Sequence, residues 1–419
     1  MKKIIIFLAV VLMANTGLWA ETQNVSYSYP VYNTEGDPAS GIKEWKTASV
    51  EATVVTDASE PVTWNAGWYV VTGTDVTLPK GAICNGDVHL ILADGAILTV
   101  GGGHYVTNAG IQVSGDGNSL TIYGQTAQTG QLEATTFGYA AGIGGKSGED
   151  GHDITINGGK IDAEGYASGI GGGNQAKGYN ITINGGEVMA LSRSNGAGIG
   201  GGSNGVEHEV SVGAYCDGHD ITINGGIVTA DGGIDASGIG GGSMGYGTDI
   251  TINGGRVIAT VDIYGERGGA GIGGGYKGVG RNITFTNGFV TAIGGVGASG
   301  IGNGADAVGS QEIFAVKRCY VRAGDSINPT DEIAHEYDTD LANQLNGNQY
   351  VTVIYDLIDA YNNGYAAGNE DGLQKGKADA LGTMGTEQTG NAVEVIKGRK
   401  KVILYNPDKV NFIKVTTEE

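Results

Sequence analysis

The sequence is poor in cysteine. Its three cysteines, Cys84, Cys216 and Cys319, lie far apart and form no CxxC pair. This spacing excludes a zinc-finger type of metal site and a disulfide framework, and the odd number leaves at least one thiol unpaired. We therefore expect buried thiols without a chemical role.

Basic residues are also scarce. The chain has 24 lysines and arginines against 45 aspartates and glutamates, and its formal net charge is −21. Such a charge opposes binding to nucleic acids and to anionic membranes. An acidic surface suits a soluble extracellular protein, and it also offers oxygen ligands to divalent cations.

Long hydrophobic runs are missing after the first 20 residues. At the start, Lys2 and Lys3 precede an apolar run over residues 4–13, and small residues close the segment near Ala20. This pattern predicts a secretory signal peptide over residues 1–20, with an apolar run too short to span a bilayer. We expect a mature protein that is secreted or attached to the cell surface, with no segment inserted in the membrane.

Glycine, with 79 residues, is abundant and follows a repeat. The segment ITINGG begins at Ile154, Ile181, Ile221 and Ile250, and a variant, ITFTNG, begins at Ile283. A GIG unit recurs with matching steps between residues 142 and 302, and both motifs stretch where residues 206–210 are inserted. A period of roughly 20–50 residues is typical of a solenoid, whose units bury their apolar faces against each other.

One repeat contains three short segments with apolar residues at every second position. Ile154 and Ile156 alternate with Thr155, Ile161 follows the NGG turn, and Ile170 lies between small residues. Alternation with period two indicates strands, and three strands per repeat predict an all-β fold, the right-handed parallel β-helix. Equivalent residues of successive coils should then stack in columns.

The corner after each ITI segment should form a second kind of column. An asparagine occupies this position in four coils, and Thr286 replaces it in the fifth. Each amide can bond to the next coil, and asparagine tolerates the left-handed backbone of a sharp corner. The expected ladder consists of Asn157, Asn184, Asn224 and Asn253.

These repeats, over residues 64–301, resemble those of bacterial secreted and cell-surface β-helix proteins with glycine-rich ITINGG and GAGIGGG repeats. The resemblance implies a carbohydrate-binding or adhesin-like protein that is secreted or associated with the bacterial cell surface or outer membrane. It transfers no ligand contact to a particular residue of this chain.

The predicted organisation has four parts. Residues 1–20 are the signal peptide, 21–61 an N-terminal lead and cap, 62–355 the β-helix with its regular repeats at 132–303, and 356–419 a C-terminal appendage. The appendage combines short strands with a helix predicted from glycines at every fourth position. These glycines are Gly364, Gly368, Gly372 and Gly376.

Candidate metal ligands lie directly before the ITI segments. Asp220 and Asp249 occupy this position in successive coils, so their carboxylates would lie about 4.8 Å apart and could share a calcium ion. The competing interpretation is structural, because Asx residues at a strand start commonly bond to the backbone of their own turn. We expect no other cofactor. His152 and His219 belong to coils separated by a third, too far apart for one metal, and are expected to be solvated turn residues.

The acids are scattered, without the carboxylate pair or the acid-and-base set that polysaccharide cleavage requires. We therefore predict a non-catalytic protein that binds an extracellular polysaccharide or a cell-surface glycan and mediates adhesion. The main alternative is a polysaccharide lyase or glycoside hydrolase on the same scaffold. A minor alternative is an ice-binding protein, suggested by an outward threonine column that comprises Thr155, Thr182, Thr222, Thr251 and Thr284.

Overall fold

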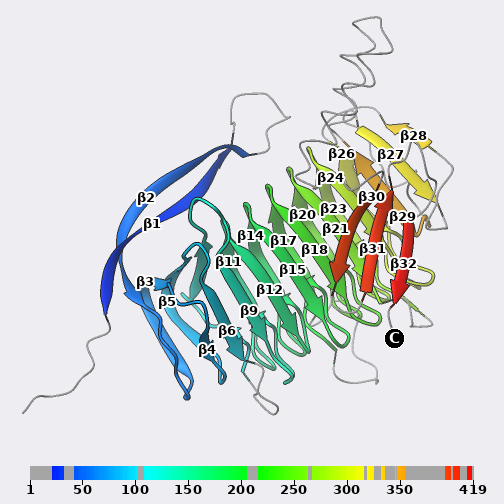
Figure 1. The fold of residues 1–419 in the computed structure, drawn as a ribbon. Coiled ribbons are helices and arrows are strands. Elements are labelled where there is room, and N and C mark those ends of the chain that lie inside the picture. Colours follow the sequence, from blue (N-terminus) through cyan, green and yellow to red (C-terminus); the bar gives the residue numbers. More distant parts are fainter. Residues whose placement is uncertain are drawn as a thin grey trace, which may run out of the picture.

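The computed structural model describes residues 21–32, 42–101, 108–204, 216–262, 267–315, 319–324, 332–335, 345, 347–354, 392–397, 400–405 and 413–417. The elements of these residues are all strands, β1 to β32, and most of them wind into a parallel β-helix (Figure 1). The predicted signal peptide and the glycine-spaced helix lie outside the described residues.

Each regular coil contributes one strand to each of three sides of the solenoid. The ITI side consists of β3 (Val62–Val71), β5 (Ala82–Leu92), β8 (Ser119–Tyr123), β11 (Gly151–Ile156), β14 (Gly178–Ile183), β17 (Gly218–Ile223), β20 (Gly247–Ile252), β23 (Gly280–Phe285) and β26 (Ile313–Ala315). The second side consists of β4 (Val76–Leu78), β6 (Ile97–Gly101), β9 (Gln131–Thr135), β12 (Lys160–Gly165), β15 (Glu187–Ser192), β18 (Ile227–Gly232), β21 (Arg256–Val261) and β24 (Phe289–Ile293). The third, the IG side, has two-residue strands: β7 (Ile111–Gln112), β10 (Ile143–Gly144), β13 (Ile170–Gly171), β16 (Ile199–Gly200), β19 (Ile239–Gly240), β22 (Ile272–Gly273) and β25 (Ile301–Gly302).

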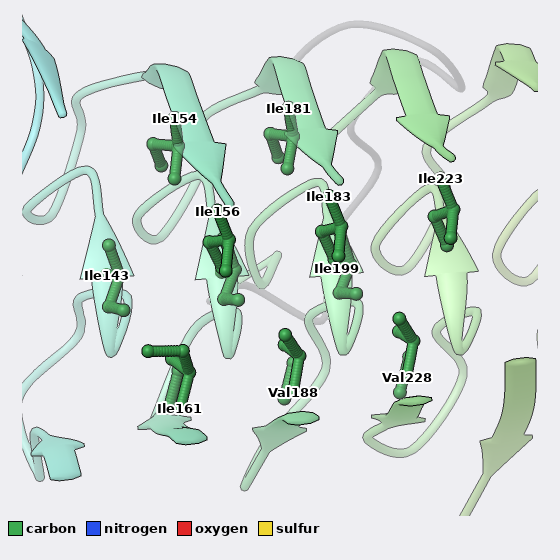
Figure 2. Close-up of a cluster of buried hydrophobic side chains, with 14 of the residues drawn as sticks. Ile143, Ile154, Ile156, Ile161, Ile181, Ile183, Val188, Ile199, Ile223 and Val228 are labelled. Carbon is green, nitrogen blue, oxygen red and sulfur yellow. The ribbon is translucent and has the colours of Figure 1, made fainter. Parts of the chain in front are cut away.

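The repeats stack in the predicted register. Ile154 pairs with Ile181 and Ile156 with Ile183, and the same pairing continues coil by coil. The side chains of the three predicted columns are buried and fill the interior of the solenoid, as Figure 2 shows for several of them. The columns are Ile156, Ile183, Ile223, Ile252 and Phe285; Ile161, Val188, Val228, Val257 and Val290; and Ile170, Ile199, Ile239, Ile272 and Ile301.

Because Ile223 points into the interior and Thr222 points outward, substitutions at these neighbouring positions should differ strongly in their effect on stability. Ile223→Asp places an unpaired charge in the apolar interior and should lower the free energy of unfolding by more than about 3 kcal/mol. Thr222→Asp, on the half-exposed outer face, should change it by less than about 1 kcal/mol. Chemical denaturation compares the two variants, and equal losses would contradict the assigned phase.

On the IG side, adjacent coils approach so closely at the glycine of each strand that no other residue fits there. Gly171 has a φ of +135°, and a Cβ added there would lie 2.0 Å from the carbonyl oxygen of Gly200. The equivalent glycines, from Gly144 to Gly273, meet the next coil in the same way. The GIG motif is therefore a requirement of coil-to-coil contact.

Gly148 provides a control for this steric requirement. It also has a positive φ, +78°, but a Cβ there would meet nothing within 4 Å. Gly148→Ala should cost only the backbone strain, about 1 kcal/mol. Gly171→Ala should cost several-fold more because two coils must separate. Similar melting temperatures for the two variants would show that the close approach is not limiting.

The asparagine ladder is present. The side-chain amide of each asparagine donates a hydrogen bond to the amide oxygen of the preceding one at 2.8 Å, and the Thr286 hydroxyl donates to Asn253 at 2.7 Å. The left-handed residue at these corners is the second glycine of NGG, such as Gly186 with a φ of +88°. The expectation that the asparagines adopt this backbone was wrong, because the glycine two residues later makes the turn.

An antiparallel hairpin covers the first coils. β1 (Thr22–Tyr32) pairs with β2 (Ile42–Val54), and β2 joins the ITI side through β3. Val25 and Ala52 of the hairpin bury the outward-facing Val70 and Ile91 in a second, smaller core. At the far end of the hairpin, the Tyr32 hydroxyl donates a hydrogen bond to the carbonyl oxygen of Asn184.

The other end closes with antiparallel strands. β26 adds a parallel strand to the ITI side, but on the second side β24 pairs antiparallel with β29 (Tyr350–Ile354). β29 pairs in turn with β27 (Cys319–Gly324), and β27 with β28 (Glu332–His335). The closing segments were expected to be further coils; instead the reversed direction ends the parallel stack.

Three further strands form a separate sheet in the C-terminal segment. β30 (Ala392–Lys397), β31 (Lys400–Tyr405) and β32 (Ile413–Thr417) are antiparallel, in agreement with the predicted short strands. Among the described residues there is no helix long and apolar enough to cross a membrane. Cys84 and Cys216 are buried free thiols, and burial raises the pKa of each to about 12.

Candidate functional site

The outer face of the ITI side is the most regular surface of the solenoid. Its residues repeat once per coil, so each position forms a column that runs parallel to the solenoid axis. The predicted threonine column is present and half-exposed. Two further positions precede the threonine on each strand. One carries a ring side chain in three successive coils, and the other carries an Asx residue in all five. Together these columns form the candidate site.

The ring column is a stacked ladder. The rings of His152 and Tyr179 are 5.0 Å apart at an angle of 16°, and those of Tyr179 and His219 are 4.9 Å apart at 1°. His152 is buried, with 6% of its surface exposed. The expectation of a solvated turn residue was therefore wrong for His152, because Tyr179 of the next coil stacks on it; His219, on the other side of Tyr179, is half-buried. Thr248 and Arg281 continue the column in the next two coils.

The Asx column has a left-handed backbone throughout. Its φ angles lie between +50° and +54°, and the residues are Asp153, Asn180, Asp220, Asp249 and Asn282. In the pairing between β11 and β14, the register passes directly from His152 to Ile154. Asp153, left-handed and outside the pairing, therefore interrupts the strict alternation without shifting the register, so that His152 lies on the outer face with Thr155.

The carboxylates of the Asx column have side-chain partners. His152 Nδ1 lies 2.7 Å from an Asp153 oxygen, and His219 Nδ1 lies 2.7 Å from an Asp220 oxygen. Asn180 donates to Asp153, and Asn282 donates to Asp249. The predicted bonds to the turn's own backbone are replaced by bonds to the neighbouring ring or coil.

Asp220 and Asp249, the predicted calcium ligands, occupy the same position of adjacent coils. Asp220 is held by His219, and Asp249 accepts the bond from Asn282. Within the described residues, no group of three or more His, Cys, Asp or Glu side chains is arranged to hold a metal ion. The pair could supply a cation with two carboxylates only, fewer than the six to eight oxygens that calcium takes.

Charged residues flank the ladder on the strand ends. Lys177 lies between Asp150 and Asp217 in the column before the strands; its backbone N–H donates to Asp150, and its Nζ lies 3.8 Å from Asp217. The N–H of Tyr246 donates to Asp217 at 2.8 Å. Burial raises the pKa of Asp217 despite these partners. Burial, followed by the charges of Asp150, Asp153 and Asp116, also raises the pKa of Tyr179.

The raised pKa of Asp217 predicts the effect of removing its charge. A carboxyl group whose pKa is higher in the folded than in the unfolded state favours folding at low pH, and this contribution is lost as the pH rises through the folded-state pKa. Asp217→Asn keeps the acceptor for Tyr246 and should equal or exceed the wild type in stability at pH 7. This advantage should shrink towards pH 4 in thermal melts. An advantage that grows on acidification would contradict the assignment.

Sequence reasoning missed the ring ladder, although a signal was present. The strings GHD, GYN and GHD precede the ITI segments of three successive coils, so their middle residues belong to one column. On the second side, Lys160 Nζ lies 4.0 Å from a carboxylate oxygen of Glu187, and both side chains are exposed. Such a pair adds little stability.

A family model described as a beta helix repeat matches residues 154–174, 181–203, 221–243 and 250–276. The matched segments contain the ITI strands and the IG strands of four coils. Comparisons with curated proteins and with solved structures gave no match. The repeat match and the stacked parallel strands agree, and the described coils form a parallel β-helix that contains these repeats.

Proposed function

We propose that this protein is a non-catalytic, extracellular binding protein, secreted or displayed on a bacterial surface, whose ITI side contacts a polysaccharide or cell-surface glycan. The ladder of His152, Tyr179 and His219, flanked by amide and carboxylate columns, is the observation that supports this proposal most directly. The signal peptide expected at residues 1–20 is consistent with export.

The ladder favours a hydroxyl-rich ligand over an apolar one. Because the rings stack on each other, their faces are largely occupied. His152 is buried, so the polar edges of Tyr179 and His219 remain for a partner. The Asp220 carboxylate engages Nδ1 of His219, which leaves Nε2 as the second hydrogen-bonding atom of this half-buried ring. Imidazole nitrogens, a phenol hydroxyl and side-chain amides can together donate to and accept from sugar hydroxyls.

The spacing of the columns favours an extended polymer. Five coils from β11 to β23 present equivalent positions about 4.8 Å apart, over a length of roughly 20 Å. A sugar chain aligned with the solenoid axis would meet the threonine and Asx columns at every coil, and the rings at three successive coils. The columns are fixed by backbone pairing, so little order would have to be gained on binding.

A substitution in the ladder tests this proposal. Tyr179→Ala removes the central ring and should weaken glycan binding by roughly tenfold or more, since aromatic anchors dominate many interfaces. Tyr139→Ala is the matched control, because Tyr139 is 58% exposed and contacts Tyr166 in another part of the coil. Glycan arrays and calorimetry with residues 21–419 would measure both variants. Equal affinities, or no glycan ligand for the wild type, would contradict the proposal.

One observation favours the catalytic alternative. His219 with Asp220, together with the partly buried Asp217 and Lys177, brings acids and bases to one part of the face. A lyase or hydrolase would use such groups as general acid and base. If the wild type released reducing ends or unsaturated uronates from polysaccharides and His219→Ala did not, catalysis would replace binding as the function. We expect no turnover from either protein.

A further inference from the structure

The outward residues on the second side of the solenoid become buried towards its C-terminal end. One outward position per strand forms a column, in the order Asp162, Met189, Thr229, Ile258, Thr291 and Thr352. The first three are partly exposed, but Ile258 is 8%, Thr291 3% and Thr352 6% exposed. The end of this face is therefore covered by another part of the chain.

These buried residues do not belong to the interior core. Val257 and Ala259, on either side of Ile258, are members of the core cluster that fills the solenoid, and Ile258 is not. Likewise, Val351 and Val353 belong to this core cluster, whereas Thr352 between them does not. Since successive side chains of a strand point to opposite faces, Ile258, Thr291 and Thr352 must face outward.

The neighbouring closing strands do not account for this burial. β29, β27 and β28 continue the second side edge to edge, by antiparallel pairing with β24. Strands that extend a sheet in its own plane leave its faces uncovered. The cover must lie on top of β21, β24 and β29.

The sheet formed by β30, β31 and β32 has the properties of such a cover. Its register places Val393, Leu404 and Ile413 in one row, and Val395, Val402 and Val415 in the next. All six residues share one face, because they are directly paired or two positions apart. An isolated sheet of three short strands with one apolar face requires a partner to bury that face.

We propose that the β30–β32 sheet docks through this apolar face onto the outer face of the second side, over β21, β24 and β29. Figure 1 draws β30–β32 at this end of the solenoid. The two sheets then pack face to face, in the manner of a sandwich. The docked sheet covers Ile258 and Thr291 and leaves the ladder on the ITI side free for its ligand.

Substitutions on the solenoid body test the docking in the full mature chain. Lys397, Arg399, Lys400 and Lys401 make the tail a substrate for trypsin once it is released. Ile258→Lys should accelerate cleavage at these residues by roughly tenfold, because local release exposes the sites. Ile227→Lys is the control, since Ile227 faces outward from β18 and is already 41% exposed. Ile258→Ser provides a milder second variant, and circular dichroism verifies the solenoid in each.

A reciprocal measurement changes the tail alone. In a Thr291→Cys protein, the new thiol should react slowly with a maleimide, as followed at residue 291 by peptide mass spectrometry. Adding Val402→Lys, on the apolar face of the tail sheet, should accelerate this reaction, whereas Ile403→Lys, on its other face, should not. Unchanged tail cleavage in both Ile258 variants, or a residue 291 thiol that stays protected after Val402→Lys, would overturn the proposal and assign the cover to a different segment.

Discussion

The close approach of successive coils on the IG side is the constraint on which the rest of the structure depends. There the backbone N–H of Ile170 donates to Gly198 and that of Gly172 donates to Gly200, at 3.0 and 2.9 Å. These bonds form only because no Cβ separates the coils. Once the coils are held in this register, every other position stacks on its equivalent. The interior columns, the asparagine ladder and the ring ladder are consequences of one axial alignment.

The sequence was sufficient to predict the solenoid because its two signals are local and periodic. Alternation assigns Ile154 and Ile156 to the interior, and the fixed repeat assigns Ile181 and Ile183 to the same columns. The hairpin was less predictable. Tyr27 and its neighbours indicate a strand, but their contact with Trp68, at 4.7 Å between ring centroids, depends on where the hairpin docks. Alternation within one segment contains no information on that docking.

The candidate site escaped prediction for a different physical reason. A strict period of two, continued backward from Ile154, places His152 in the interior. The left-handed Asp153 breaks this phase, and alternation alone does not predict which residue adopts a left-handed backbone. The Asp153 carboxylate contacts the ring of His152 and accepts a hydrogen bond from Asn180 of the next coil, so the stacked neighbour helps to stabilise this conformation. The candidate site is thus a product of the stack and does not exist in a single repeat.

The same dependence favours the proposed glycan binding over ice binding for the ITI side. Ordered water requires a flat, uniform array, and the threonine column alone would provide one row of it. Beside that row, however, the outer positions change from His152 and Tyr179 to Thr248 and Arg281 along the stack. Side chains of such different length and charge give a graded surface instead of a lattice. A surface that repeats its backbone spacing but varies its side chains suits a polymer whose successive units need not be identical.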